Sequence, residues 1–368
     1  MLRAIWLICI FTTIMNAKRI LVCPLDWGLG HATRCIPIIE QLVDEGREVI
    51  IAASGRPALL LKQAFPNLQH IVFAGYDISY PKNGNMAWWA LMNAPRLLKK
   101  IQQEHLELLE IVKTQRIDAI LSDNRYGLWH PTIKSIFITH QLHIACPPWL
   151  FWLKPFLRAM NISLLRRFHA VWVPDHHPEK AKPLAGALSA PLKEIKNLHY
   201  IGPLSRLIKQ PEPAVKSYDL LVLLSGPEPQ RSLFEEKIRS QLKDTKLRVL
   251  LVRGMPEAGT HIETTETIHS AGHLRTQQLQ GAIAAAKIVL ARSGYSTVMD
   301  LAKLKAKAIF VPTPGQTEQE YLAAYLQQQK ISYSESQHQF NLMRCINNAA
   351  KFSGFQLAFV ESDINSLL

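Results

Sequence analysis

Short apolar runs alternate with segments of helical periodicity along most of the chain, and this alternation restricts the possible folds more than any other feature. The apolar runs of the first half have the length and composition of buried strands, and they cover residues 19–25, 48–54, 118–123, 135–140 and 170–175. Helical periods separate some of them at 35–46 and 96–115. Because strands that alternate with helices pair in parallel, we expect a parallel sheet with helices on both faces.

The same alternation restarts after residues 199–219, a charged segment with four prolines or glycines that is typical of a linker. Strand-like runs then lie at 220–226, 247–254, 287–292 and 307–312, and helical periods at 231–243, 276–286, 297–305 and 318–330. A chain of 368 residues is too long for one core. We therefore expect an α/β fold of two Rossmann-like domains facing across a cleft, at residues 18–203 and 219–368 with a linker at 204–218.

Composition narrows the class of partner. The formal net charge of +13 favours an anionic partner such as a nucleotide or an acidic membrane surface. No run of basic and stacking residues typical of nucleic-acid binding is present, so we do not expect nucleic acid. The cysteines are scattered without the spacing of a metal site or a disulfide framework, which favours a reducing compartment; they are Cys9, Cys23, Cys35, Cys146 and Cys345.

Residues 1–17 form an apolar segment that is too short to span a bilayer comfortably. A secretory signal cleaved after Ala17 is one interpretation, but Met15 fits the cleavage pattern poorly. The other is a start-site extension, with translation beginning at Met15, since the run from Lys18 is already typical of a first strand and loop. We favour it because the cleavage signal is weak. An anchoring role for residues 1–17 stays open.

The stretch ARSGYSTVMD, residues 291–300, follows a buried strand-like run and opens a helix. Ligands of open α/β sheets lie beyond the carboxyl ends of strands, where a helix N-terminus offers N–H donors and a partial positive charge. Small residues let a phosphate approach, so we predict that a diphosphate is held by Ser293, Gly294, Ser296 and Thr297. The alternative is that one hydroxyl merely caps the helix.

A second stretch, VPTPGQTEQEYLA at 311–323, repeats the pattern of strand, glycine-containing loop and helix start. Gln319 and Glu320 offer an amide and a carboxylate, which suit vicinal sugar hydroxyls that both donate and accept. Asp300 could accept hydrogen bonds from ribose hydroxyls. Helix capping is again the alternative.

The first half carries a corresponding loop, DWGLGHATR at 26–34, in which Gly28 and Gly30 let the chain bend close to a ligand. His31 would stand at the start of a helix, where an imidazole could take the proton of an acceptor hydroxyl as a general base. Asp123, at the end of another strand-like run, could orient that imidazole. The alternatives are a ligand contact without proton transfer for His31 and a capping role for Asp123.

Together these stretches resemble the GT-B nucleotide-sugar glycosyltransferases, and in particular the group that contains the N-acetylglucosaminyltransferase of peptidoglycan lipid synthesis. RSGYSTVMD matches the donor loop of that group, with Asp300 where the relative has Glu and with Gln319–Glu320 where it has two glutamines. The resemblance implies that the remaining donor contacts come from Ser225 and Gly226 near the phosphates, from the backbone around Leu274 near uracil, and from Arg292 and Gln316.

The resemblance also implies an inverting transfer of a hexose or N-acetylhexosamine from a UDP-sugar to an acceptor hydroxyl of a glycolipid, a polysaccharide or a small molecule. It implies neither a bound metal nor another cofactor, and the histidine pairs at 140/143 and 176/177 lack metal-ligand partners at suitable spacing. The alternatives are a nucleotide-sugar hydrolase or 2-epimerase of the same fold, or a non-catalytic nucleotide-sugar-binding subunit.

Two stretches, 85–100 and 146–168, combine Trp, Phe and Leu with Arg and Lys. Such a mixture suits a surface that contacts lipid headgroups, although the same residues fit an ordinary core or an acceptor groove. We expect a cytoplasmic protein, with association at the inner face of the cell membrane as the open alternative, in keeping with an acceptor that is lipid-linked.

Overall fold

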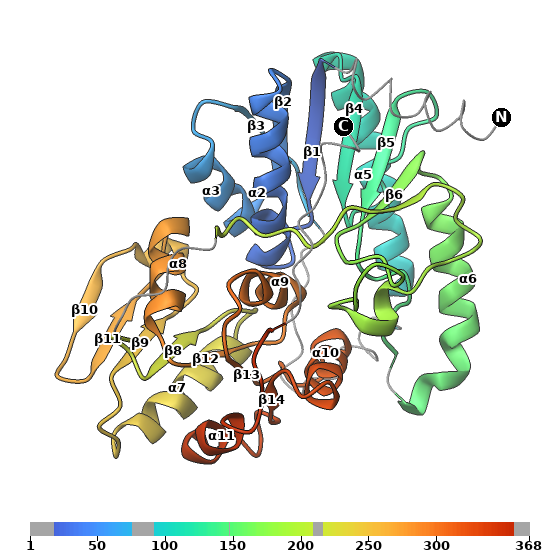
Figure 1. The fold of residues 1–368 in the computed structure, drawn as a ribbon. Coiled ribbons are helices and arrows are strands. Elements are labelled where there is room, and N and C mark those ends of the chain that lie inside the picture. Colours follow the sequence, from blue (N-terminus) through green and yellow to red (C-terminus); the bar gives the residue numbers. More distant parts are fainter. Residues whose placement is uncertain (1–17, 76–91, 147, 209–215, 357–368) are drawn as a thin grey trace. The chain divides into compact units, whose positions relative to one another are not determined.

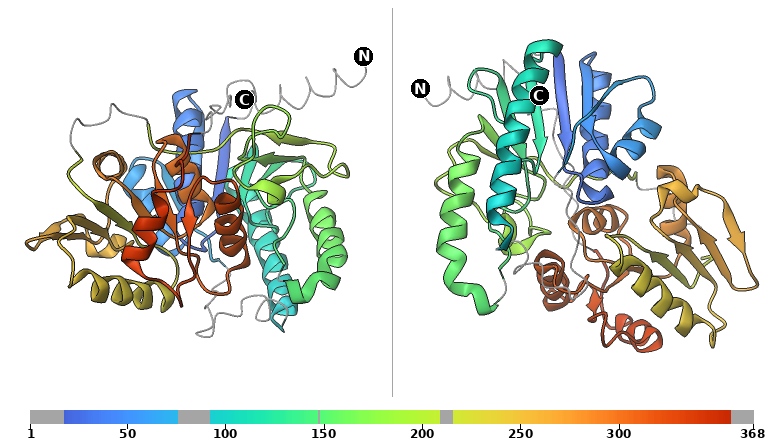
Figure 2. Two further views of the ribbon diagram at one scale, coloured as in Figure 1. Left: turned by 60° about the horizontal axis from the view of Figure 1, so that its bottom comes forward. Right: turned by 180° about the vertical axis from the view of Figure 1, so that it is seen from behind.

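The computed structural model describes residues 18–75, 92–146, 148–208 and 216–356. They fall into two compact units, which we call unit 1 (residues 18–75 and 92–204) and unit 2 (residues 205–356). Each unit contains one seven-stranded sheet with helices packed against it (Figures 1 and 2). The α/β prediction is therefore confirmed.

The sheet of unit 1 is parallel throughout and has the order β3-β2-β1-β4-β5-β6-β7. Its strands are β1 Arg19–Pro24, β2 Glu48–Ala53, β3 Gln69–Val72, β4 Ala119–Asp123, β5 Lys134–Ile138, β6 Ala170–Val173 and β7 Leu198–Tyr200. The helices are α2 Leu29–Asp44, α3 Gly55–Ala64, α5 Ala94–Gln115 and α6 Lys154–Leu165, with short 3-10 turns η1 Pro148–Leu153 and η2 Gly186–Ser189.

The order of strands reverses between β1 and β4, because the chain first builds outward through β2 and β3 and then returns to build the other side. Pro24 of β1 lies opposite Asp123 of β4, so the two strands end side by side. This topological switch point is where open parallel sheets bind ligands, since the flanking loops diverge there and leave room. His31 and Asp123 both lie at this end of the sheet.

Unit 2 repeats the plan with the order β10-β11-β9-β8-β12-β13-β14 and a switch point between β8 and β12. Its strands are β8 Leu220–Leu223, β9 Val249–Val252, β10 Ile262–Thr264, β11 Ile268–Ala271, β12 Val289–Ala291, β13 Ala308–Phe310 and β14 Tyr333–Ser334. Its helices are α7 Gln230–Leu242, α8 Thr276–Ala285, α9 Tyr295–Lys303, α10 Thr317–Gln328 and α11 Leu342–Ala349, with the turn η3 Pro256–Ala258.

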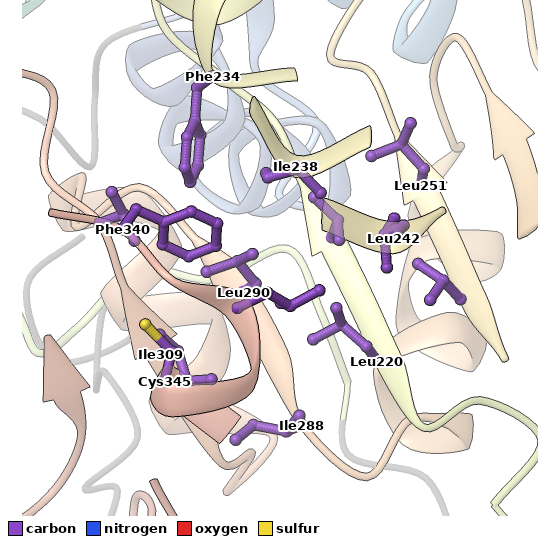
Figure 3. Close-up of a cluster of buried hydrophobic side chains, with 14 of the residues drawn as sticks. Leu220, Phe234, Ile238, Leu242, Leu251, Ile288, Leu290, Ile309, Phe340 and Cys345 are labelled. Atoms are coloured by element: carbon purple, nitrogen blue, oxygen red, sulfur yellow. The ribbon is translucent and has the colours of Figure 1, made fainter. Parts of the chain in front are cut away.

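The core of unit 2 forms where α7 and α11 pack against the middle of the sheet (Figure 3). Phe234 and Ile238 of α7 meet Leu290 and Ile309 of the central strands, and Phe340 packs edge-on against Phe234 with their ring centroids 5.2 Å apart. These strands are buried on both faces, which explains their continuous apolar runs. In unit 1, separate clusters cover β1 and β4 on one side and β5 and β6 on another.

Several elements differ from the expectation. The helix expected at 35–46 begins at Leu29, so His31 lies in its first turn. The strand β7 occupies part of the segment expected as a linker at 199–219. The antiparallel pair β10 and β11 was missed, because its residues are polar and, in β10, exposed. Residues 1–17 and 85–91, for which an anchor and a membrane contact were considered, lie outside the described residues.

Within the described part of the chain, we find no helix that combines the length and the apolar character needed to cross a bilayer.

The core of unit 2 gives a first test. Replacing Ile238 by Ala should lower the free energy of unfolding by about 2–5 kcal/mol, because this side chain is 0% exposed and its loss leaves a cavity. Leu233→Ala on the same helix is the matched control. Leu233 is 47% exposed, so its replacement should change stability by only about 0.5 kcal/mol. Urea unfolding of both variants measures the difference, and equal losses would contradict this account of the core.

Candidate functional site

Three loops of unit 2 meet at its switch point. They leave the carboxyl ends of β8, β12 and β13, whose last residues Leu223, Ala291 and Phe310 are in register. A Cβ added to Gly226 would lie 3.7 Å from the Thr313 hydroxyl, and one added to Gly294 would lie 4.0 Å from Nε2 of Gln319. The glycines thus leave the space between these loops open, as a phosphate site requires.

Gly294 is the N-cap of α9 and supplies no side-chain capping bond. Its backbone has φ −68°, which any residue can adopt, so the fold does not require glycine there. Ser296 and Thr297 lie half-buried in the first turn of the same helix. The helix N-terminus and these two hydroxyls therefore lie next to a position that carries no side chain.

Thr313 adds a donor that the sequence analysis did not single out. Its side chain is 1% exposed, yet its Oγ1 is buried without a hydrogen-bond partner in the described part of the chain. A buried hydroxyl left in this state costs free energy, commonly about 1–3 kcal/mol. A ligand oxygen held between Gly226 and Gly294 would satisfy it.

Arg292 is committed to the fold. Its guanidinium donates to the carbonyl oxygens of Val311, Pro312 and Gln230 and to the side chain of Gln337, at 2.6–3.1 Å. It also lies 4.3 Å from the centroid of the Phe234 ring. Burial lowers its pKa to about 9, so it remains charged at neutral pH. We assign Arg292 to holding the ends of β12 and β13 together rather than to direct contact with a donor.

Residues of both predicted stretches also make contacts that hold the loops of unit 2 in place. Ser293 donates to the carbonyl oxygen of Gln319 at 2.7 Å, and Oε1 of Gln319 accepts from the Thr313 N–H at 2.8 Å. Glu320 accepts from the Gly315 N–H at 2.9 Å, and Gln316 is the N-cap of α10. The amide Nε2 of Gln319 is left on the side of Gly294, where it can donate to a ligand.

Asp300 receives a hydrogen bond from the hydroxyl of Ser205 at 2.6 Å. Burial raises the pKa of Asp300 to about 6, and the nearby Arg206 and the Ser205 hydroxyl only partly offset that rise. A carboxyl group with this pKa is largely ionised at neutral pH and can accept hydrogen bonds. Elsewhere, Ser225 is exposed after β8, whereas Leu274 is buried just before α8, so that only its backbone could reach a base.

In unit 1, the structure brings His31 and Asp123 together across 92 residues of sequence. Nδ1 of His31 lies 3.1 Å from Oδ2 of Asp123, with the carboxylate fully buried and the imidazole 16% exposed. Gly28 caps the helix with φ +89°, which favours glycine and turns the chain so that His31 falls in the first turn of α2. The predicted pair therefore exists as a dyad.

Arg34, one helical turn after His31, completes this cluster and was not anticipated. Its Nε lies 2.8 Å from Oδ1 of Asp123, and its Nη2 contacts the same oxygen and lies 3.0 Å from Nδ1 of His31. Two further residues join, with Nη1 of Arg34 3.3 Å from Nδ1 of His140 and the thiol of Cys35 3.8 Å from Asp123. The only sequence signal for Arg34 was its i+3 spacing from His31.

Arg34 and Asp123 compete for one nitrogen of His31. A carboxylate only accepts, so its contact needs a proton on Nδ1, whereas a guanidinium only donates, so its contact needs a bare Nδ1. In the first case Nε2 carries a lone pair and can act as a base. In the second case Nε2 carries the proton and can only donate.

Charge decides how this cluster titrates. Burial alone would raise the pKa of Asp123, but Arg34 and His31 outweigh it and the pKa is lowered overall. An ionised Asp123 favours a proton on Nδ1 of His31, the tautomer that leaves Nε2 as a base. Burial, with the Asp123 charge adding to it, raises the pKa of the Cys35 thiol well above its ordinary value, so Cys35 is not a nucleophile here.

Among the described side chains, no group of three or more His, Cys, Asp and Glu could hold a metal ion. His140 contacts Arg34, and His176 lies beside the carbonyl oxygen of Lys182 at 3.1 Å.

The comparisons with known proteins identify the domains and the fold. Residues 234–353 match the Glycosyltransferase family 28 C-terminal domain, and residues 18–131 match Glycosyl transferase family 1. No curated protein matches the sequence. Among solved structures, the spinosyn rhamnosyltransferase SpnG is 14% identical, with a TM-score of 0.62 and coverage of 92% of this chain and 93% of that chain. The chain has the GT-B fold of nucleotide-sugar glycosyltransferases.

Two further GT-B structures extend the likeness. Acinetobacter baumannii MurG is 13% identical, with a TM-score of 0.55 and coverage of 92% of this chain and 91% of that chain. SpnG complexed with thymidine diphosphate is 15% identical, with a TM-score of 0.58 and coverage of 92% and 93%. The resemblance inferred from the donor-loop stretches is thus confirmed, and glycosyltransferase domains match parts of both units.

The Asp123 cluster gives a second test. Arg34→Met should lower the free energy of unfolding by about 3–5 kcal/mol near neutral pH, because it leaves a buried carboxylate without its main counterion. The lowered pKa of Asp123 stabilises the fold above the unfolded-state pKa and loses this effect as pH falls through the folded-state value. The loss caused by Arg34→Met should therefore shrink toward acid.

Urea unfolding between neutral and acid pH measures this dependence. Lys62→Met, which removes an exposed cation from α3, is the control and should leave stability nearly unchanged at every pH. A loss for Arg34→Met that stays constant as pH falls would contradict the assignment.

Proposed function

We propose that this protein transfers a hexose or N-acetylhexosamine from a UDP-sugar to an acceptor hydroxyl, with inversion at the anomeric carbon. Unit 2 binds the donor and unit 1 supplies the general base. The observation that carries the proposal is the group of contacts around two glycines of unit 2. The helix α9 begins directly after Gly294, and the Thr313 hydroxyl beside Gly226 has no partner among the described residues.

The donor site is argued from the chemistry of a diphosphate. Its negative charge suits the N-terminus of α9 and the hydroxyls of Ser296, Thr297 and Thr313. These groups also stabilise the charge that develops on the leaving diphosphate, so the proposed transfer needs no bound metal. The amide of Gln319 and the carboxylate of Asp300 suit the hydroxyls of the sugars. UDP is chosen over other nucleotides because of the sequence resemblance in residues 291–300.

The base is argued from the geometry of His31. With its Nδ1 proton donated to Asp123, Nε2 can accept the proton of an acceptor hydroxyl as that oxygen attacks the anomeric carbon. The bond between the acceptor oxygen and the anomeric carbon forms as the bond between the anomeric carbon and the diphosphate oxygen breaks. The diphosphate leaves as an anion. A single displacement of this kind inverts the anomeric centre.

Donor binding can be tested with one hydroxyl. Thr313→Val should weaken UDP binding about 10- to 100-fold, because a hydrogen bond to a charged group contributes about 1.5–3 kcal/mol. It should leave the unliganded protein at least as stable as the wild type, since it removes a buried hydroxyl that has no partner among the described residues. Ser332→Ala is a matched control, because the Ser332 hydroxyl is also buried without a partner among the described residues.

Calorimetric titration with UDP, GDP and TDP and their sugars measures these affinities. Wild-type protein that binds none of these nucleotides would refute the donor assignment. Thr313→Val protein that binds UDP as tightly as wild type would remove Thr313 from the site.

The base can be tested by separating transfer from binding. His31→Ala should reduce the rate of sugar transfer about 10²- to 10⁴-fold while leaving the affinity for UDP unchanged. Replacing the exposed His261 of unit 2 by Ala should affect neither. Release of free sugar at the same rate with and without any acceptor would instead support a hydrolase, and full transfer activity in His31→Ala would exclude His31 as the base.

A further inference from the structure

The contact between His31 and Asp123 favours a charged form of the histidine. Nδ1 of His31 lies 3.1 Å from Oδ2 of Asp123, and Asp123 is 0% exposed. An ionised carboxylate at this distance favours the imidazolium form of its partner, because opposite charges attract strongly away from water. An imidazolium carries protons on both ring nitrogens and has no lone pair to accept another. Asp123 alone would therefore orient His31 but also favour the form that cannot act as a base.

Arg34 supplies an opposing charge within the same cluster. Its Nε lies 2.8 Å from Oδ1 and 3.0 Å from Oδ2 of Asp123, and its Nη2 also contacts Oδ1. The guanidinium therefore reaches both carboxylate oxygens, an arrangement that makes strong, charge-assisted hydrogen bonds. Arg34 is only 2% exposed, yet a guanidinium does not lose its proton in proteins, so it stays charged. The pair of Asp123 and Arg34 carries no net charge.

This balance of charge makes a second proton on His31 unfavourable. With Arg34 in place, an imidazolium would leave two cations against one carboxylate in a cluster whose side chains are only 0–16% exposed. A net charge in such surroundings costs free energy. Nη2 of Arg34 lies 3.0 Å from Nδ1 of His31, close enough to repel a positive charge on the ring directly. Asp123 can then accept the Nδ1 proton while the ring stays neutral.

The other titratable groups in contact with this cluster come from α2 and from the end of β5, the strand beside β4 (Figure 1). Cys35 of α2 lies 3.8 Å from Asp123, and burial raises the pKa of its thiol well above the ordinary value, so the thiol is neutral. His140 follows β5 and is 2% exposed, with its Nδ1 3.3 Å from Nη1 of Arg34. Because a guanidinium only donates, this nitrogen of His140 accepts and carries no proton. His140 is therefore an uncharged support for the far side of the Arg34 guanidinium.

We propose that Arg34 is a positioning residue that balances the charge of Asp123, so that the carboxylate fixes the Nδ1–H tautomer of His31 without turning the imidazole into an imidazolium at neutral pH. Nε2 of His31 then keeps its lone pair. The use of that lone pair in sugar transfer rests on the proposed function. The tautomer and the charge of His31 do not, so the two can be tested apart.

The NMR signals of the imidazole nitrogens report the tautomer and the charge of each histidine directly. In the full chain with isotope-labelled histidine, long-range proton–nitrogen spectra of the wild type and of His31→Gln identify the His31 signals by difference. Wild-type His31 should be neutral at neutral pH, with its proton on Nδ1. This measurement needs neither a nucleotide nor an acceptor.

Removing the charge of Arg34 tests its role. In Arg34→Met, the pH at which His31 titrates should rise by about 1–3 units, because the imidazole becomes the only cation beside Asp123. Arg34→Gln, which keeps an amide donor but no charge, should show a rise in the same direction and replaces Arg34→Met if that variant does not fold. Arg34→Lys restores the charge without the planar fork, so His31 should titrate nearer to its wild-type value.

Two controls separate charge from packing. His140→Leu removes a contact of Arg34 within the same buried cluster but removes no charge, so it should move the titration of His31 much less than Arg34→Met does. Lys62→Met removes an exposed cation from α3 and should leave the titration unchanged, because exposed charges are screened.

Three outcomes would overturn the proposal. The first is a wild-type His31 whose proton lies on Nε2, or which carries both protons, at neutral pH. The second is an uncharged Arg34 variant in which His31 titrates at the wild-type pH or below it. The third is a shift in His140→Leu as large as that in Arg34→Met, which would assign the effect to packing. Failure of the protein to bind UDP or to transfer sugar would refute the proposed function and leave this result untouched.

Discussion

Parallel strand direction is the constraint on which both candidate sites depend. When every strand of a sheet points the same way, the loops that follow them gather at one edge, and the switch point keeps two of these loops apart. Asp123 meets His31 because Pro24 and Asp123 are in register at the ends of β1 and β4. In unit 2, the loops after Leu223 and Ala291 leave neighbouring strand ends for the same reason. Strand order and register thus bring together residues that are far apart in the sequence, whatever their side chains.

The Asp123 cluster and the loops around Gly294 differ in how their buried polar groups are satisfied. In unit 1, the charge of Asp123 is matched by Arg34, and its remaining contacts are used to orient His31. In unit 2, the Ser293 hydroxyl donates to the carbonyl oxygen of Gln319, and the Gln319 side chain accepts from the N–H of Thr313. The Thr313 hydroxyl has no partner among the described residues. A polar network whose members are all hydrogen-bonded, such as the Asp123 cluster, is rigid. A buried hydroxyl without a partner, such as that of Thr313, calls for an explanation, and a bound ligand would supply one.

The sequence was sufficient for the broad architecture and for the dyad. Alternating apolar runs predict parallel sheets, and a glycine-rich loop after the first strand places His31 opposite the next strand end. Arg34 could not be predicted, because its role depends on the full burial of Asp123, and no local pattern reveals that burial. Thr313 looked like an ordinary loop residue until the space left by Gly226 was known. The strand β10 was missed because a polar, exposed edge strand lacks the apolar alternation on which such predictions depend. Its partner β11 was missed because it is short and half polar.

The arginine of the Arg-Ser-Gly sequence has a structural role that does not depend on a ligand. Arg292 reaches backward to three carbonyl oxygens and the ring of Phe234, so the architecture of unit 2 would demand it whether or not a nucleotide ever arrived. Gly294 is under no such demand, since its backbone would accept alanine. Homologues that lost glycosyltransferase activity would therefore be expected to keep the arginine for folding but not necessarily the glycine. The glycine is then the better sequence marker of an active enzyme.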